Sequence, residues 1–244
     1  MTKQSGLGDN LLVDGYDLSG DIQAIGNVGG GVAVLDVTGI DKSAYERIGG
    51  LRDGRIEVTT FFNPSRAHPV LSALPYTDVN VSYLRGTTLG NPAASLVAKQ
   101  ISYDGTRAAD GMFTFGVSAQ ANSYGLVWGQ QLTAGLRTDT TATDGTGIDT
   151  TASADFGWSA FLHLTAFTGT NVTMTIEDSA DDITYAALTD GSFGALTGIG
   201  TVRIAGATST ATVRRYIRAV TSGTFTSATF AVVLHKGSDP GTVF

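Results

Sequence analysis

Three histidines, His68, His163 and His235, are the residues best suited by type to bind a metal ion or to transfer a proton. None has another histidine two or four residues away, the spacing that places two ligands on one face of a strand or helix. A cross-strand pair of His163 with His235 is conceivable, although isolated strand histidines are more often structural. The sequence has no cysteine, which excludes disulfides and thiolate sites and leaves the redox compartment open. We therefore predict no metal site.

The densest acidic cluster is Glu177–Asp182, where an expected strand turns back. Its carboxylates could converge on Ca²⁺, but the cluster lacks the spacing and the glycine of an EF-hand loop. Asp and Ser at this position are also ordinary turn residues. Two other glutamates, Glu46 and Glu57, lie in segments typical of a surface helix and a surface strand. With no convergent acid pair, we predict no catalytic site.

Arg214, Tyr216 and Arg218 share one face of an expected strand, with Arg215 between them. This pattern is compatible with an anion or nucleic-acid platform, with the exposed side of a strand, or with a subunit interface. The formal net charge of −7 argues against tight binding of nucleic-acid phosphates. The sequence contains no Gly-x-Ser-x-Gly motif, and the glycines of Gly26–Gly31 precede no phosphate-binding Lys-Thr or Lys-Ser pair. We predict neither an enzyme nor a cofactor.

The elements around these residues read as mainly β. The chain has 32 glycines in 244 residues and 15% charged residues, which suits many strands joined by tight turns. In the strand expected over residues 55–62, Ile56 and Val58 alternate with Arg55 and Glu57. Two short helices are predicted, over 38–48 and 68–74. Further strands are expected over residues 32–37, 79–83, 96–103, 112–121, 124–132, 157–166, 171–177, 185–188, 200–204, 213–220 and 228–235.

A shift in composition suggests how the chain is organised. Residues 137–154 are polar without apolar periodicity, which predicts a linker or a long loop. We expect an N-terminal arm over 1–35, a β domain over 36–136, a β-sandwich over 155–236 and a tail over 237–244. The N-terminus lacks the apolar core of a signal peptide, and no apolar run approaches the roughly 18 residues of a membrane span. We predict synthesis in a cytoplasm without secretion or membrane insertion.

Several stretches resemble the tail tube (major tail) proteins of long-tailed, non-contractile bacteriophages. The most specific are Val37–Gly54 (VTGIDKSAYERIGGLRDG), Arg85–Ala94 (RGTTLGNPAA) and Tyr124–Gly129 (YGLVWG). Arg215–Arg218 and the segment from Thr221 to Val233 are also similar to the family. The similarity extends over nearly the whole chain.

The resemblance implies a tail-tube-type β-sandwich or barrel with one or two flanking short helices, plus a C-terminal sandwich that is Ig-like or related. In this family six copies form a ring whose inner strands make a continuous β-barrel, and the rings stack into a hollow tail. The expected location is the virion tail, assembled in the host cytoplasm. The expected partners are further copies of the chain, the tape-measure protein, the tail terminator and the distal tail protein, with DNA passing through without specific binding. In another arrangement, both halves form one enlarged tube fold.

On this interpretation Glu57 faces the lumen, because Ile56 and Val58 face the core. Arg47, Arg52 and Arg55 are candidates for ion pairs at the subunit interface. The expected arm to the neighbouring ring contains Leu11, Leu12 and Val13.

The alternative function is a β-sandwich binding or decoration module of a virion, for adhesion to a host surface or a carbohydrate. An exposed aromatic cluster would favour that function. The two tryptophans, Trp128 and Trp158, lie in apolar strand-like contexts and are expected in the core. A hydrolase, the third reading, has no support in the residue pattern.

Overall fold

A computed structural model describes residues 5–238 and confirms the mainly β fold class. The described residues divide into two compact units. Unit 1 comprises residues 5–21, 80–95 and 128–238, and unit 2 comprises residues 22–79 and 96–127. This differs from the linear order of domains expected from the sequence, since unit 1 is assembled from three separate segments. Short strands near the N-terminus and in the middle of the chain pair with each other and with the C-terminal half.

Unit 1 is built around two long antiparallel strands, β11 (Trp158–Ser179) and β14 (Tyr216–Lys236). They pair from Trp158↔Lys236 to Ser179↔Tyr216, with bulges near residues 164–171. Each strand therefore replaces two of the separate strands expected from the sequence. The remaining elements of this unit are β1 (Asn10–Val13), β2 (Tyr16–Asp17), the 3₁₀ helix η1 (Ser19–Asp21), β5 (Val79–Leu84), the first residues of β6 (Pro92–Arg107), β8 (Val127–Gln131), β9 (Arg137–Asp139), β10 (Ile148–Asp149), β12 (Ala186–Leu196) and β13 (Gly200–Ala205).

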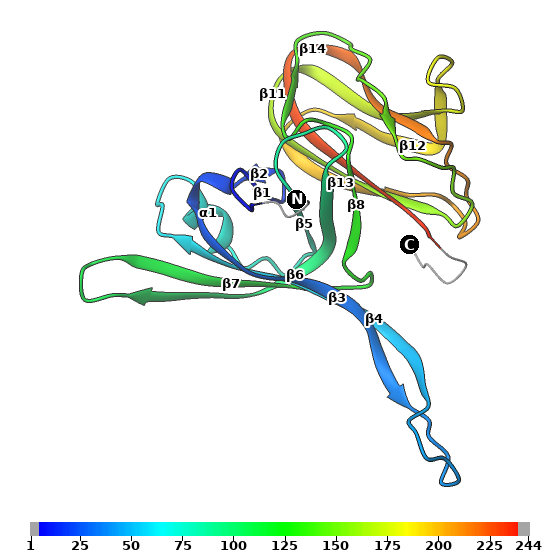
Figure 1. The fold of residues 1–244 in the computed structure, drawn as a ribbon. Helices are drawn as coiled ribbons and strands as arrows, with labels where there is room; N and C mark the ends of the chain where they lie inside the picture. Colours follow the sequence, from blue (N-terminus) through cyan, green and yellow to red (C-terminus); the bar gives the residue numbers. More distant parts are fainter. Residues whose placement is uncertain (1–4, 239–244) are drawn as a thin grey trace. The chain divides into compact units, whose positions relative to one another are not determined.

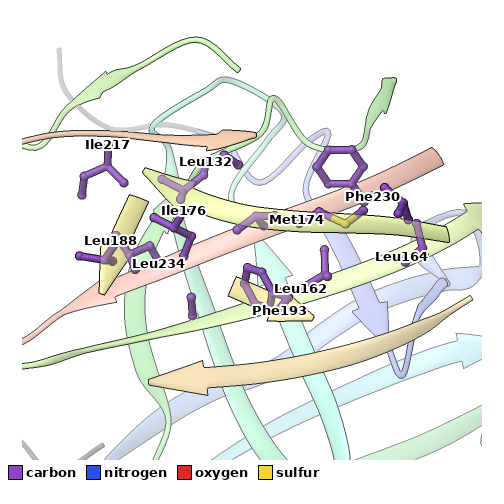
Figure 2. Packing of buried hydrophobic residues seen from close by; sticks show 14 of the residues in the cluster. Leu132, Leu162, Leu164, Met174, Ile176, Leu188, Phe193, Ile217, Phe230 and Leu234 are labelled. Carbon is purple, nitrogen blue, oxygen red and sulfur yellow. The ribbon is translucent and has the colours of Figure 1, made fainter. Parts of the chain in front are cut away.

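Both halves of β11 contribute to one apolar core, shown in Figure 2. Leu162 and Leu164 lie before the bulges, Met174 and Ile176 lie after them, and all four are fully buried. The core therefore includes residues on both sides of the bulges. The bulged region of the β11–β14 pair also requires a glycine in β14. Gly223 has φ +116°, and a Cβ there would lie 2.6 Å from the carbonyl oxygen of Asn171.

The expected linker is part of unit 1. β9 and β10 pair with β14, and an isolated bridge joins Asp144 to Val220 between them. Backbone hydrogen bonds and ion pairs attach this segment to the β14 region. It therefore needs no apolar face of its own, which explains why its sequence lacks apolar periodicity.

From residue 5 onward, the expected N-terminal arm is also part of the folded chain, and residues 1–4 of that arm lie outside the described residues. β1 pairs with β5, and Leu11, Leu12 and Val13 are 3%, 0% and 7% exposed. The latter part of the expected arm, from Ile22 onward, forms β3 (Ile22–Asp36) of unit 2. The burial of Leu11, Leu12 and Val13 removes apolar surface from water and holds this segment against β5.

Unit 2 contains a four-stranded antiparallel sheet in the order β3, β4 (Arg47–Phe61), β7 (Phe113–Ala121) and the later part of β6. One short helix, α1 (Ala67–Leu71), matches the helix predicted over 68–74. β7 pairs with β4 only from Arg55 to Phe61. The distal part of β3 and β4 therefore continues as a two-stranded hairpin, coloured blue to cyan in Figure 1.

The helix predicted over 38–48 is wrong, because this segment connects β3 to β4. The Thr38 hydroxyl, expected to cap a helix, accepts a hydrogen bond from the Glu46 backbone N–H at 2.9 Å. The Val37 N–H also donates to the Glu46 carbonyl at 3.0 Å. Pairing across the hairpin thus outweighs the local capping pattern.

Candidate assembly interface

The sheet of unit 2 has one apolar face. Ile56 and Val58 of β4 are buried there, together with Phe115, Val117 and Ala119 of β7. This confirms the alternation predicted for residues 55–62.

Helix α1 packs on this face through polar and aromatic contacts. The Gln100 side-chain amide donates to the Leu71 carbonyl at 2.5 Å. His68 Nδ1 lies 3.0 Å from the Tyr103 hydroxyl, and Tyr103 stacks on Phe115 with ring centroids 4.1 Å apart. His68 therefore has a structural position between the helix and the sheet.

The opposite face of the sheet is polar and consists largely of small residues. Across it, Glu57 lies opposite Ser118, which lies opposite Ser102. In the neighbouring row Thr59 lies opposite Gly116, which lies opposite Asp104. These six residues line one shallow depression, so the carboxylates of Glu57 and Asp104 occupy the same face. The Glu57 carboxylate lies 3.4 Å from the Arg55 guanidinium and keeps 39% of its side chain exposed.

Both outer strands of this sheet are edges. Within the four-stranded sheet, β3 pairs only with β4, and the Ala98–Arg107 part of β6 pairs only with β7, although β6 as a whole also pairs with β5 and β8. Each edge presents unpaired backbone N–H and C=O groups that can accept a further strand.

The distal hairpin carries many exposed apolar side chains among its charged ones. Its large exposed hydrophobic residues, which we call the hairpin patch, are Val32, Val34, Leu35, Val37, Ile40, Tyr45, Ile48 and Leu51. Leu35 lies directly opposite Ile48, and eight such side chains on one hairpin are more than isolated surface residues would explain, so we take this hairpin as a candidate interaction surface.

The three arginines expected at an interface all lie on β4. Arg55 is paired with Glu57 within the chain. Arg47 stacks over the Tyr45 ring at 4.7 Å, and Arg52 is exposed. Within residues 5–238, neither Arg47 nor Arg52 has a carboxylate within ion-pair distance.

The hairpin leaves the sheet at a crossing point that requires glycine. A Cβ on Gly54 would lie 2.5 Å from both the backbone nitrogen and the Cβ of Leu126, and one on Gly30 would lie 2.9 Å from the same Cβ. The loop before β8 therefore passes closely over the two strands, and any larger side chain would displace it.

In unit 1, the arginine face predicted from the sequence is neutralised by carboxylates. Arg214 lies 2.6 Å from Asp178, and Arg215 lies 2.6 Å from Asp149. Arg218 contacts both Glu177 and Asp144, at 2.7 and 2.9 Å. These pairs attach the 137–154 segment and the end of β11 to residues 214–218, so all three of these arginines already have a carboxylate partner within the chain.

The acidic cluster at Glu177–Asp182 has ordinary turn chemistry. The Asp181 carboxylate accepts hydrogen bonds from the backbone N–H groups of Ile183 and Thr184, which hold its pKa down to about 2. No group of three potential ligands suited to a metal ion occurs in the described part of the chain. Among those residues there is also no helix with the length and apolar character needed to cross a membrane.

The two strand histidines do not pair, since His163 lies opposite Ala231 and His235 lies opposite Ser159. His163 is fully buried. Its Nδ1 accepts from the Gly15 N–H at 3.4 Å, and its Nε2 lies 2.9 Å from the Ser82 hydroxyl. Burial lowers the pKa of His163 to about 3, so the ring is neutral and structural.

The tryptophans behave differently from each other. Trp158 is fully buried, as expected, but Trp128 is 47% exposed, so its expected core position is wrong. Trp128 lies beside Gly129, where a Cβ would meet the Leu234 carbonyl at 2.2 Å.

No protein-family model and no curated relative matches the chain. Solved structures that align with it include a chain from the virion of a native gene transfer agent particle, at 13% identity and TM-score 0.41, covering 51% of this chain and 97% of that one. The Dit protein of phage SPP1 aligns at 11% identity and TM-score 0.34, covering 93% and 98%. A chain of the phage p2 baseplate aligns at 8% identity and TM-score 0.35, covering 94% and 98%. Each TM-score lies below 0.5, and the function proposed below rests on this chain's own residues.

Proposed function

We propose that this chain is a structural protein of a phage tail, which assembles through unit 2 into stacked hexameric rings that form a hollow tube. The observation that supports this most directly is the hairpin patch. Its apolar side chains are exposed on a hairpin that extends beyond its own sheet, and burial against a further copy would remove them from water. The resemblance of Val37–Gly54 to tail tube proteins falls on this same hairpin.

The strand directions support ring closure. The four strands alternate in direction, so β3 and β6 run in opposite directions at the two edges. When copies are placed side by side, β3 of one copy meets β6 of the next in antiparallel orientation. The sheet can then continue through every subunit and leave no edge. Because such contacts are heterologous, Arg47 and Arg52 would pair with carboxylates of a neighbouring copy.

In such a ring the polar face lines the bore and α1 lies outside. Glu57 and Asp104 would place negative charge along the path of DNA, so that phosphates are repelled and the nucleic acid slides without binding. The tape-measure protein, the tail terminator and the distal tail protein are the proposed partners. The proposed location is the virion tail after assembly in the host cytoplasm.

Negative-stain electron microscopy of the purified protein at high concentration tests the assembly. Hollow tubes or six-fold rings are expected, whereas monodisperse monomers would argue for the second candidate below.

The role of Glu57 is tested separately. Tubes with Glu57→Arg should form normally, bind DNA at low salt and slow its ejection. The control is Asp155→Arg, a matching charge change at an exposed position of unit 1. Its tubes should also form normally, but they should neither bind DNA nor slow its ejection. Unchanged ejection from tubes with Glu57→Arg would count against its position in the bore.

The second candidate is a binding or decoration module of a virion. It is favoured by one observation, the exposed indole of Trp128. This function would require no tube formation.

A further inference from the structure

Unit 1 contains a cavity that is lined by both polar and apolar side chains. Its volume is about 240 Å³, below the roughly 300 to 1,000 Å³ of pockets that take drug-sized ligands. A site of this size suits a single small ring. The lining residues are Trp128, Gly129, Gln130, Leu132, Ile148, Thr150, Leu234 and Lys236.

The strand register explains why these side chains converge. Gln130 of β8 lies opposite Leu234 of β14. Trp128 lies two residues before Gln130, and Lys236 lies two residues after Leu234, so all four share one side of the two strands. The segment that follows β10 contributes Thr150 from across the cavity.

The cavity combines an apolar floor with a polar rim. Leu132, Ile148 and Leu234 are 1%, 6% and 3% exposed and form the floor. Trp128 provides an aromatic wall that solvent reaches.

Lys236 is the cation of the rim and is held in place. Its ammonium donates to the Thr150 hydroxyl at 2.6 Å and to the Ala152 carbonyl at 2.5 Å. An ammonium has three donors, so one N–H stays available within the described residues. Burial also lowers the pKa of Lys236, which is consistent with a position inside the cavity mouth.

We propose that this cavity binds one sugar ring, with an acidic sugar preferred over a neutral one. A sugar has an apolar C–H face, which stacks on an indole, and hydroxyl groups, which bond to Gln130, Thr150 and Lys236. A ring carboxylate would accept the third ammonium donor in a charge-assisted hydrogen bond. The cavity lies entirely in unit 1 and does not depend on the assembly proposed for unit 2.

The two tryptophans provide a direct assay, because Trp158 is fully buried and Trp128 is not. The intact protein is titrated with the methyl glycosides of glucose, galactose, N-acetylglucosamine, rhamnose and glucuronic acid while tryptophan emission is recorded. A saturable change is expected, with the glucuronide binding tightest. An oligosaccharide that contains glucuronic acid then shows whether the site accepts a chain or a free ring.

Variants identify the site, with affinities measured by ligand-observed NMR. Trp128→Ala should weaken binding by about tenfold or more, equivalent to about 1.4 kcal/mol. Lys236→Met should remove the preference for the glucuronide, while Lys42→Met, at an exposed lysine of unit 2, should leave it unchanged. Because Trp128 is 47% exposed, Trp128→Ala is expected to fold. This variant therefore still tests the proposal if Lys236→Met does not fold. Absence of saturable binding by every probe, or equal binding by the wild type and Trp128→Ala, would overturn the proposal. Electron microscopy of the same Trp128→Ala sample reports on tube formation independently.

Discussion

Leu51 offers a quantitative test of assembly through the hairpin patch. It lies on β4 beyond the last residue paired with β7 and is 86% exposed. Burying a leucine side chain contributes about 1.5–3 kcal/mol. Since about 1.4 kcal/mol is a factor of ten, Leu51→Ser should weaken each subunit contact by about 10- to 150-fold. The free energy of unfolding of the monomer should change by less than about 0.5 kcal/mol, because water already reaches this side chain.

The assay measures the critical concentration for tube formation by sedimentation and electron microscopy, with the melting temperature of the monomer recorded in parallel. Ile183→Ser is the matched control, since Ile183 is 83% exposed but lies in unit 1 outside the hairpin patch. The critical concentration should rise for Leu51→Ser and stay constant for Ile183→Ser. The reasoning fails if both variants assemble like the wild type, or if Leu51→Ser lowers the melting temperature enough to explain the loss.

Three further predictions concern stability. Gly54→Ala should lower the free energy of unfolding by about 1–3 kcal/mol in urea titrations, because its Cβ would overlap the loop that crosses the hairpin. Gly31→Ala, where nothing lies within 4 Å of the added Cβ, should have no comparable effect. Arg215 depresses the pKa of Asp149 to about 2, so this pair stabilises the fold above the unfolded pKa and is lost as pH falls toward 2. The difference in melting temperature between the wild type and Asp149→Asn should therefore vanish near pH 2. His163, whose folded pKa is lowered to about 3, should stay neutral in NMR titrations from pH 8 to 4, and stability should fall as pH decreases below about 6.5, the unfolded pKa. Protonation of His163 near pH 6 in the folded protein would refute this.

Side-chain alternation predicted most of the strands and their buried faces. Ile56 and Val58 are buried while Glu57 points to the polar face, and Phe115 and Val117 are buried on β7. This succeeds because the period of two in a strand is a local property that tertiary contacts reinforce.

Local pattern failed where a distant partner decided the conformation. Thr38 has the spacing of a helix cap, yet it bonds across a hairpin to Glu46. Trp128 lies in an apolar stretch, yet it lines an open cavity with residues distant in the sequence and is 47% exposed.

The sequence by itself determined the mainly β class, the faces of the strands and the absence of cysteine chemistry, because these follow from composition and from spacing between near neighbours. Only the tertiary structure decided that Leu11–Val13 are buried in β1 and that strands within residues 137–154 pair with β14. It also decided that each unit is assembled from stretches of chain that are separated in the sequence. These features depend on pairing between residues far apart in the sequence, whose register no local pattern specifies.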